Sequence, residues 1–390
     1  MSLDIHKMKR LELLNTCREL GVVGYSSKNK LQLIEMIVRV STLSILNSDD
    51  NKLLNSRDII IEKTTELNRL KKLNVIDLFC GCGGMSKGLT DAGLNVIAGI
   101  DFWDRAVESY NKNFEHKAYC EDLTKLSPKQ FNEMYNKENN VVDVIVGGPS
   151  CQSFSIAGRR DKNDPRDTLF MEYVKYLDYF KPKAFIMENV IGILSKKTDS
   201  GEKVIDIIMD LLTRNYNCKI NKMYASDFEV PQNRRRTIII GIRKDLDITP
   251  EEPERVIKLV HDRIPVKQIL IPKENVDLSN FLSERAIQGI MKKKEKSKNR
   301  GVGFGAQFLD FEKPSYTIPA RYWKDGYDAL VRYNDKEIRR LTITELKRIQ
   351  SFPDDYTITG SKKDIIMQIG NAVACRFAYH LGKYIINILQ

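Results

Sequence analysis

From residue 73 onward, short apolar runs alternate with longer stretches whose apolar residues recur at helical spacing. Strands buried on both faces of a parallel sheet have such uninterrupted apolar runs, whereas half-exposed strands alternate apolar with polar residues. The pattern therefore predicts a doubly wound α/β domain over residues 73–243. The expected strands are residues 75–79, 96–100, 141–146, 184–187 and 237–240.

The N-terminal stretch has a different pattern, with apolar residues at helical spacing in residues 8–20 and 31–37. A Gly-Tyr turn and a Lys-x-Lys pair lie between these segments. The arrangement resembles the SAP module, a two-helix unit that binds duplex DNA. We therefore expect a SAP-like unit at residues 1–46 and a polar linker at residues 47–72. A helical hairpin that packs on another part of the chain would have the same pattern.

The regular alternation fails in residues 244–345, where prolines are frequent and a lysine-rich cluster occupies residues 292–300. Aromatic and basic residues alternate around Trp323, a composition that suits contact with phosphates and base edges. We expect a smaller, irregular domain here. The apolar end of the chain, residues 346–390, is expected to return to the first domain.

Two features at expected strand ends suggest a nucleoside-binding site. A glycine-rich turn, Phe79-Cys80-Gly81-Cys82-Gly83-Gly84, follows the first strand, and Asp101 ends the second. Such a turn lets the backbone approach a ligand closely, and an acidic residue after the second strand typically holds a ribose. Ser86 replaces the third glycine of the dinucleotide fingerprint, so adenosylmethionine is favoured over a dinucleotide.

Three further positions are candidates for catalysis. Cys151 lies in a Gly-Gly-Pro-containing turn after an expected strand, where a thiol is accessible and can act as a nucleophile. Glu188 ends another expected strand, although a carboxylate there could also cap the following helix. Arg234 and Arg236 precede the strand at residues 237–240 and need anionic partners, unless they form a solvated charge run.

Composition narrows the partners and the compartment. The net charge of +11 and the pI near 9.1 favour an anionic partner such as nucleic acid, although surplus surface lysine gives the same balance. The seven cysteines lack disulfide or zinc spacing, so we expect free thiols, no metal and a reducing compartment. No apolar run approaches the roughly 20 residues of a membrane span, and no secretory signal is present. We expect a cytoplasmic protein, associated with the nucleoid if the host is prokaryotic.

Six motifs in this order resemble the C5-cytosine DNA methyltransferases over residues 73–390: the glycine-rich turn, Cys151, Glu188-Asn189-Val190, Gln232-x-Arg234-x-Arg236, Arg340-Leu341-Thr342 and Gly370-Asn371-Ala372-Val373. The resemblance implies a Rossmann-like methyltransferase domain and a target-recognition domain at residues 244–345. It also implies methyl transfer from S-adenosyl-L-methionine to C5 of a cytosine flipped out of duplex DNA. A restriction-modification role is expected, with a monomeric enzyme and possible pairing with a separately acting restriction endonuclease.

The resemblance also implies roles for individual residues. Cys151 would add to cytosine C6, Glu188 would act at N3, and Arg234 and Arg236 would orient Glu188 and the cytosine O2. The cofactor would contact Phe79, Gly81, Gly83, Asp101, Phe102, Asp122, Leu123, Leu169, Asn371 and Val373. The DNA would contact Gln152, Ser155, Arg159, Arg160, Asn189 and Gln232. The family usually has proline immediately before the nucleophile, where this chain has Ser150, with Pro149 one position earlier.

Two other functions fit the same motifs. A tRNA-directed branch shares the fold, but its Cys-Phe-Thr tripeptide is absent before residue 339, which favours DNA. A DNA-binding relative without activity would keep the fold, but every candidate catalytic residue is present here.

Overall fold

The structure is a computed structural model that describes residues 10–20, 22, 33, 37, 72–138, 140–149, 169–198, 201–299, 306–324 and 326–389. Of residues 10–12, 293 and 296–299 only the backbone is described. The chain divides into two compact units, Met1–Lys72 and Leu73–Gln390. Among the described residues, no helix has the length and apolar character needed to cross a membrane.

In the N-terminal unit, helix α1 (Arg10–Glu19) buries Leu13 and Cys17. Leu33 and Ile37 of the second predicted helical segment are also buried, and the Cys17 thiol lies 3.9 Å from the Leu33 carbonyl oxygen. The apolar positions of the two segments therefore form an interior. The Gly-Tyr turn and its lysines lie outside the described residues, so DNA binding by this unit stays a prediction.

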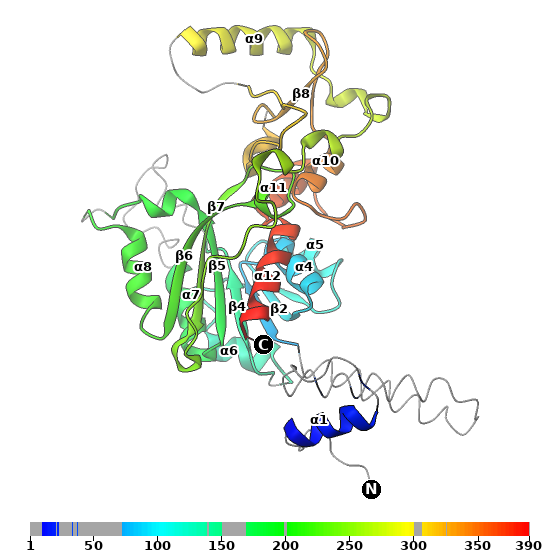
Figure 1. Cartoon of the computed structure of the whole chain (residues 1–390). Helices are drawn as coiled ribbons and strands as arrows, with labels where there is room; N and C mark the ends of the chain where they lie inside the picture. Colours follow the sequence, from blue (N-terminus) through cyan, green and yellow to red (C-terminus); the bar gives the residue numbers. More distant parts are fainter. Residues whose placement is uncertain are drawn as a thin grey trace. The chain divides into compact units, whose positions relative to one another are not determined.

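The second unit is built on a seven-stranded sheet with the order β3-β2-β1-β4-β5-β7-β6 (Figure 1). Its strands are β1 (Asn74–Leu78), β2 (Asn95–Asp101), β3 (Ala118–Cys120), β4 (Val144–Gly147), β5 (Ala184–Val190), β6 (Tyr216–Tyr224) and β7 (Arg235–Arg243). Strands β1 to β5 are parallel, which confirms the predicted doubly wound fold.

Strand β7 differs from the prediction because it runs antiparallel to both β5 and β6. Its apolar run resembled that of a parallel strand. However, residues 225–234, which connect β6 to β7, contain a short 3-10 turn and no crossover helix, so the chain reverses direction. The reversal brings Arg236 opposite Val190, at the end of β5.

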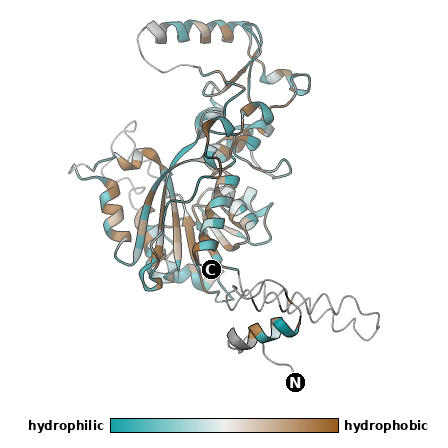
Figure 2. Cartoon of the chain, viewed as in Figure 1, coloured by the Kyte–Doolittle hydropathy of each residue, from teal (hydrophilic) through white to brown (hydrophobic). Residues whose placement is uncertain are grey.

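Helices cover both faces of the sheet, and the central strands are the most hydrophobic part of this unit (Figure 2). Helices α4 (Gly84–Ala92) and α12 (Cys375–Leu389) pack on one face, with Leu89 and Phe377 in the same core as Val144. The other face is covered by α6 (Pro128–Tyr135), α7 (Leu169–Phe180) and α8 (Val204–Leu212). Helix α5 (Asp104–Asn111) packs beside the glycine-rich turn through Tyr110.

A separate hydrophobic core lies in residues 266–371, which we call the small lobe. The lobe contains α9 (Glu284–Asn299), the hairpin β8 (Leu330–Arg332) and β9 (Ile338–Arg340), α10 (Ile343–Ile349) and α11 (Lys362–Asn371). Its core includes Leu346, Ile349, Ile366 and Ile369. The expected boundary at residue 345 thus runs through this core, because α10 and α11 pack with the preceding segment and only α12 packs on the sheet.

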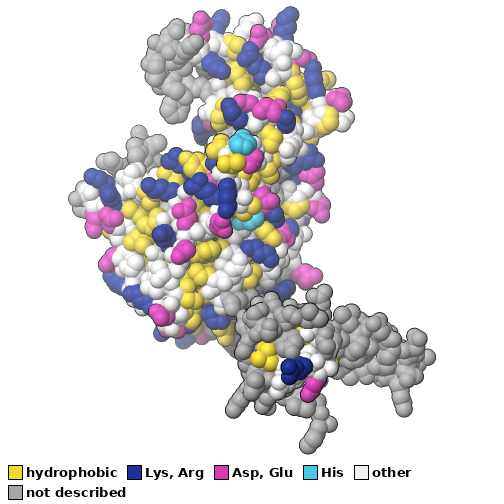
Figure 3. Space-filling model, viewed as in Figure 1, with side chains coloured by type: hydrophobic (Ala, Val, Ile, Leu, Met, Phe, Trp, Pro, Cys, Tyr) yellow, Lys and Arg dark blue, Asp and Glu magenta, His cyan; other side chains and the backbone are white. Residues whose placement is uncertain are grey.

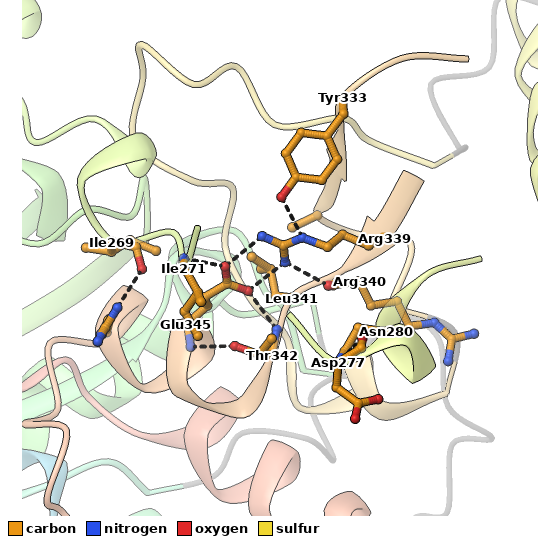
Figure 4. Close-up of polar contacts among 12 residues, drawn as sticks. Ile269, Ile271, Asp277, Asn280, Tyr333, Arg339, Arg340, Leu341, Thr342 and Glu345 are labelled. Carbon is orange, nitrogen blue, oxygen red and sulfur yellow. Dashed lines mark hydrogen bonds and ion pairs between the residues drawn. The ribbon is translucent and has the colours of Figure 1, made fainter. Parts of the chain in front are cut away.

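A fully buried ion pair stabilises the small lobe. Two guanidinium nitrogens of Arg339 each donate to one carboxylate oxygen of Glu345, both at 2.8 Å (Figure 4). Glu345 also accepts hydrogen bonds from the backbone amides of Ile271 and Thr342, at 2.9 and 2.8 Å. A buried charge is tolerated when partners satisfy all its hydrogen-bonding positions. This pair therefore joins β9, the start of α10 and the segment around Ile271.

Candidate active site

The parallel strands β4 and β5 end side by side, at the edge where open α/β sheets bind their ligands. Gly148 and Pro149 follow β4, and the Asn189 side-chain amide donates to the Pro149 carbonyl oxygen at 3.0 Å. Strand β5 therefore holds the start of the turn that carries Cys151. Cys151 itself lies outside the described residues, as do Ser150 and the predicted substrate residues Gln152, Ser155, Arg159 and Arg160.

Glu188 and Arg236 form an ion pair at this edge. Arg236 Nε donates to Glu188 Oε1 at 2.6 Å, and each side chain is only 12% exposed. Among the residues that the structure describes, Glu188 Oε2 accepts no hydrogen bond. A Cβ atom at Gly148 would lie 3.3 Å from this oxygen, so glycine keeps the space beside it open. The pair therefore presents one carboxylate oxygen next to the turn after β4.

Arg234 lies deeper, with only 4% of its surface exposed. Its Nη1 donates to the Gly370 carbonyl oxygen at 3.2 Å, and its Nε has no partner among the described groups. Burial, aided by the neighbouring Arg236 charge, lowers the pKa of Arg234 to about 9, so the side chain stays protonated at neutral pH. Arg234 therefore links the start of β7 to α11 and places a positive charge behind Arg236.

The intervening arginine, Arg235, is exposed and points the other way, as expected for alternate residues of a strand. Its guanidinium lies 5.6 Å from the centre of the Tyr224 ring and donates to the Tyr224 hydroxyl at 3.2 Å. The three consecutive arginines thus have different environments, and only Arg236 contacts Glu188.

The glycine-rich turn after β1 has the conformation of a ligand-binding loop. Phe79, Gly81 and Gly83 all have positive φ angles, of 62°, 55° and 92°. Asp101 fixes this turn, because its carboxylate accepts from the Gly81 and Trp103 amides at 2.8 and 2.9 Å. Burial raises the pKa of Asp101, and these amide hydrogen bonds oppose the rise. An acidic group is thus held beside open space, since a Cβ at Gly81 would meet no atom within 4 Å.

The residues around this turn fit a nucleoside cofactor. Phe102 is 75% exposed, an unusual position for a large aromatic ring and a suitable one for stacking on a base. The Asp122 carboxylate accepts from the Thr124 amide and hydroxyl, which lowers its pKa. Leu123 is only 3% exposed and packs in the core, so any cofactor contact at this position involves its backbone.

The remaining predicted cofactor residues come from distant parts of the sequence. A Cβ at Gly84 would lie 2.3 Å from the Val373 carbonyl oxygen, so the segment after α11 packs directly on the start of α4. Asn371, the last residue of α11, is exposed, and Leu169, the first residue of α7, is partly buried. The structure therefore brings Val373 to the glycine-rich turn, as the cofactor prediction requires.

Gln232 and Asn189 are placed differently from the substrate contacts predicted for them. Gln232 is fully buried, and its amide contacts the Ile349 carbonyl, the Gln350 side chain and the Ile318 amide. Asn189 is 6% exposed and holds Pro149. These internal hydrogen bonds favour positioning roles for both residues over direct DNA contact.

A buried hydrogen-bond chain behind the glycine-rich turn was missed by the sequence analysis. Ser86 donates to Asp77 at 2.6 Å, the Tyr110 hydroxyl donates to Ser86 at 2.8 Å, and His116 lies 2.9 Å from that hydroxyl. Burial raises the pKa of Asp77 to about 7. The serine at the position of the third fingerprint glycine was the one signal of this chain. No group of three or more possible metal ligands occurs in the part of the chain described.

A Rossmann-like sheet with a nucleoside-type loop after β1 and a Glu–Arg pair at the end of β5 is typical of methyltransferases that use a nucleoside cofactor. The chain belongs to the C-5 cytosine-specific DNA methylase family, whose model matches residues 73–387. It is therefore a DNA (cytosine-5-)-methyltransferase. The type II methyltransferase M.FnuDI of Fusobacterium nucleatum is 33% identical over 341 residues, covering 80% of this chain and 94% of that protein.

Other relatives match to different extents. M.DdeI of Desulfomicrobium norvegicum is 41% identical over 192 residues, 48% of this chain and 45% of that protein. Among solved structures, the S. pombe Dnmt2 methyltransferase has a TM-score of 0.65 at 19% identity, covering 82% of this chain and 98% of that one. At this level of identity the likeness shows the fold alone.

Proposed function

We propose that this enzyme transfers a methyl group from S-adenosyl-L-methionine to C5 of a cytosine that is flipped out of a specific duplex DNA sequence, through a transient bond between Cys151 and C6. The observation that carries the proposal is the Glu188–Arg236 pair beside the turn that leads to Cys151, with Gly148 leaving space at Oε2. A nucleophile and a proton donor are thus expected on one side of the same opening.

The other cysteines support Cys151 as the nucleophile. The reactive form of cysteine is the thiolate, so a raised pKa makes a thiol inert. The pKa is raised in every other cysteine of the chain: Cys17, Cys80, Cys82, Cys120, Cys218 and Cys375. Burial is the largest cause in each case.

The proposed chemistry uses the free oxygen of Glu188. When the Cys151 sulfur adds to C6, negative charge develops on the pyrimidine ring. The Glu188 carboxyl, carrying a proton on Oε2 while Arg236 holds Oε1, donates a hydrogen bond to N3 and stabilises this charge. Arg236 holds the other carboxylate oxygen, and buried Arg234 adds positive charge behind it. After methylation, a general base takes the C5 proton, the electron pair of that C–H bond restores the C5–C6 double bond, and the Cys151 thiolate leaves with the sulfur–C6 bonding electrons.

When bound, S-adenosyl-L-methionine supplies an electrophilic methyl group and leaves as S-adenosyl-L-homocysteine. The residues proposed to hold it are Phe79, Gly81, Gly83, Asp101, Phe102, Asp122, Leu123, Leu169, Asn371 and Val373. The open space at Gly81 and the exposed ring of Phe102 support this assignment. The fixed carboxylate of Asp101 lies where a ribose hydroxyl would be recognised.

The DNA must present a base outside its stack, since C6 cannot be reached from within a duplex. We propose that the segment after Cys151, with Gln152, Ser155, Arg159 and Arg160, contacts the DNA and that the small lobe reads the sequence. The SAP-like N-terminal unit would add phosphate contacts. The type II naming of the relatives supports a role in protecting DNA from a restriction endonuclease that acts separately. We further propose that the enzyme is a monomer and acts in the cytoplasm.

Bisulfite sequencing of DNA from cells that express this chain tests the proposal, with Cys151→Ser as the matched control. The expected result is protected cytosines within one sequence context for the wild type and complete conversion for the variant. Complete conversion with both folded proteins would refute the proposed function.

A further inference from the structure

Net charge does not by itself locate a DNA-binding surface on this molecule. On the face shown in Figure 3, Lys and Arg side chains are interspersed with Asp and Glu. Several cations of the small lobe are paired with carboxylates, including Lys267 with Glu312 and Lys313 with Asp310. Cations that lack such partners are therefore the more informative ones.

One cavity of the small lobe gathers such cations. It has a volume of about 180 Å³ and is lined by Trp323, Arg340, Lys362 and Lys363, with Leu341 and Ile366 among its apolar walls. No carboxylate lines it. Within the described ranges, neither Arg340 nor either lysine has an ion-pair partner within 4.0 Å. We call this cavity the basic pocket.

Arg340 enters the basic pocket because strand β9 alternates its side chains. Arg339 points to Glu345, and Arg340 points away from this pair (Figure 4). The Arg340 Nε is buried and has no hydrogen-bond partner among the described groups. A buried cation without a counter-charge costs free energy, so the charge of this guanidinium favours an anionic ligand in the pocket.

The two lysines come from the first turn of α11. Lys363 Nζ lies 4.8 Å from the centre of the Trp323 ring, which places its ammonium against one wall of the pocket. The nearby Asp364 carboxylate forms the capping box of α11 with Ser361. Asp277 interacts with Lys362 through longer-range charge attraction only and forms no ion pair with it. The helix N-terminus adds a favourable field for an anion.

Size and position limit the ligand. A cavity of about 180 Å³ is smaller than the roughly 300–1,000 Å³ of pockets that enclose whole small molecules, so it fits one charged group. Lys362 lies eight residues before Gly370, whose carbonyl oxygen accepts a hydrogen bond from Arg234. At about 1.5 Å of rise per residue, Lys362 and Gly370 lie about 12 Å apart along α11, a length that corresponds to roughly three or four base pairs of DNA.

We propose that the basic pocket binds a phosphate group of the DNA backbone, a few base pairs from the methylated cytosine. A guanidinium and two ammonium groups match the charge and hydrogen-bonding geometry of a phosphate. This inference rests on the proposed function, since it takes the same DNA as its ligand. Free phosphate offers the same chemistry, and the experiment below separates the two sources.

The test compares Lys362→Gln/Lys363→Gln with the control Lys267→Gln/Lys313→Gln, which removes the same charge from carboxylate-paired sites. Duplex binding by the full-length protein is measured by fluorescence anisotropy at several NaCl concentrations. Loss of one phosphate contact should reduce the slope of log K against log salt by about 0.9 in the pocket variant. The control should keep the wild-type slope. Equal slopes in pocket variant and wild type, or equal reductions in both variants, would overturn the proposal.

Arg340→Gln provides a second variant, with the same expected reduction in slope. Inorganic phosphate is titrated into the same proteins by calorimetry. If the pocket variant loses phosphate binding while its slope of log K for DNA against log salt stays unchanged, the ligand of the pocket is free phosphate and not DNA. If the wild type methylates cytosine and neither pocket variant changes the salt slope, only the inference about the basic pocket is refuted. If the wild type binds DNA but does not methylate it, only the proposed function is refuted.

Discussion

Removing Arg236 should strongly slow methyl transfer, whereas removing the neighbouring Arg235 should have little effect on it. Arg236→Met deletes the only partner of Glu188 among the described residues. The Glu188 carboxylate would then be free to rotate, and its charge would be poorly solvated at 12% exposure. The Gly148 side of the site would lose the fixed oxygen that the proposed mechanism requires.

The expected magnitude follows from the geometry of the pair. Removing one group that stabilises charge in the transition state costs about 2.7–4 kcal/mol of activation free energy. Because both side chains keep some exposure and one nitrogen–oxygen contact joins them, the low end, about 3 kcal/mol, applies. At 1.36 kcal/mol per factor of ten, Arg236→Met should slow transfer roughly 100-fold. Arg236→Lys keeps the charge but loses the planar fork, and should slow it roughly 10-fold.

The assay is single-turnover transfer of labelled methyl groups to saturating unmodified DNA. Arg235→Met is the matched control, since Arg235 is adjacent in the sequence but stacks on Tyr224. Its rate should stay within about twofold of the wild type. An Arg236→Met enzyme within threefold of the wild type, or an Arg235→Met enzyme that is equally slow, would refute the reasoning.

Three other changes test separate parts of the account. Cys151→Ser should abolish methyl transfer while leaving duplex affinity unchanged in a gel-shift assay; measurable transfer by this variant would contradict the mechanism. Burial raises the pKa of the Asp77 carboxyl from its ordinary 3.8 to about 7. The folded protein therefore binds the carboxyl proton more tightly than the unfolded chain does, and the free energy of unfolding falls as the pH rises from about 4 to 7. Asp77→Asn should remove this dependence, so the change in Tm on mutation should be more favourable at pH 8 than at pH 5; equal changes at both pH values would count against a buried acid. Deleting residues 1–45 should weaken DNA binding and flatten its salt dependence without altering which site is methylated, whereas unchanged affinity across salt would make the N-terminal unit a docking element.

The sequence predicted strands best where burial is complete. The runs at residues 75–79, 96–100 and 184–187 correspond closely to β1, β2 and β5, because strands buried on both faces leave a continuous apolar signal. Strand β6 was missed, since it lies at the sheet edge and carries polar residues such as Asn217 and Lys219. The antiparallel direction of β7 was also missed, because direction depends on the connection and not on the strand.

The candidate site was predictable as a set of residue types but not as an arrangement. Motif order located Glu188 and the arginines, yet only the β5–β7 register shows that Arg236 meets Glu188 and that Arg234 is buried. The family resemblance implied a DNA contact for Gln232. Its burial depends on packing against Ile318 and Gln350, which are far away in the sequence.

The most direct test of the account is a covalent trap. Duplex DNA with 5-fluorocytosine at the methylated position lacks the C5 proton whose loss permits elimination, so the sulfur–C6 bond should persist. With S-adenosyl-L-methionine present, mass spectrometry of the digested complex should find the methylated fluoropyrimidine attached to the peptide that contains Cys151. DNA methylated at C5 by a protein that forms no adduct at Cys151 would contradict the central claim.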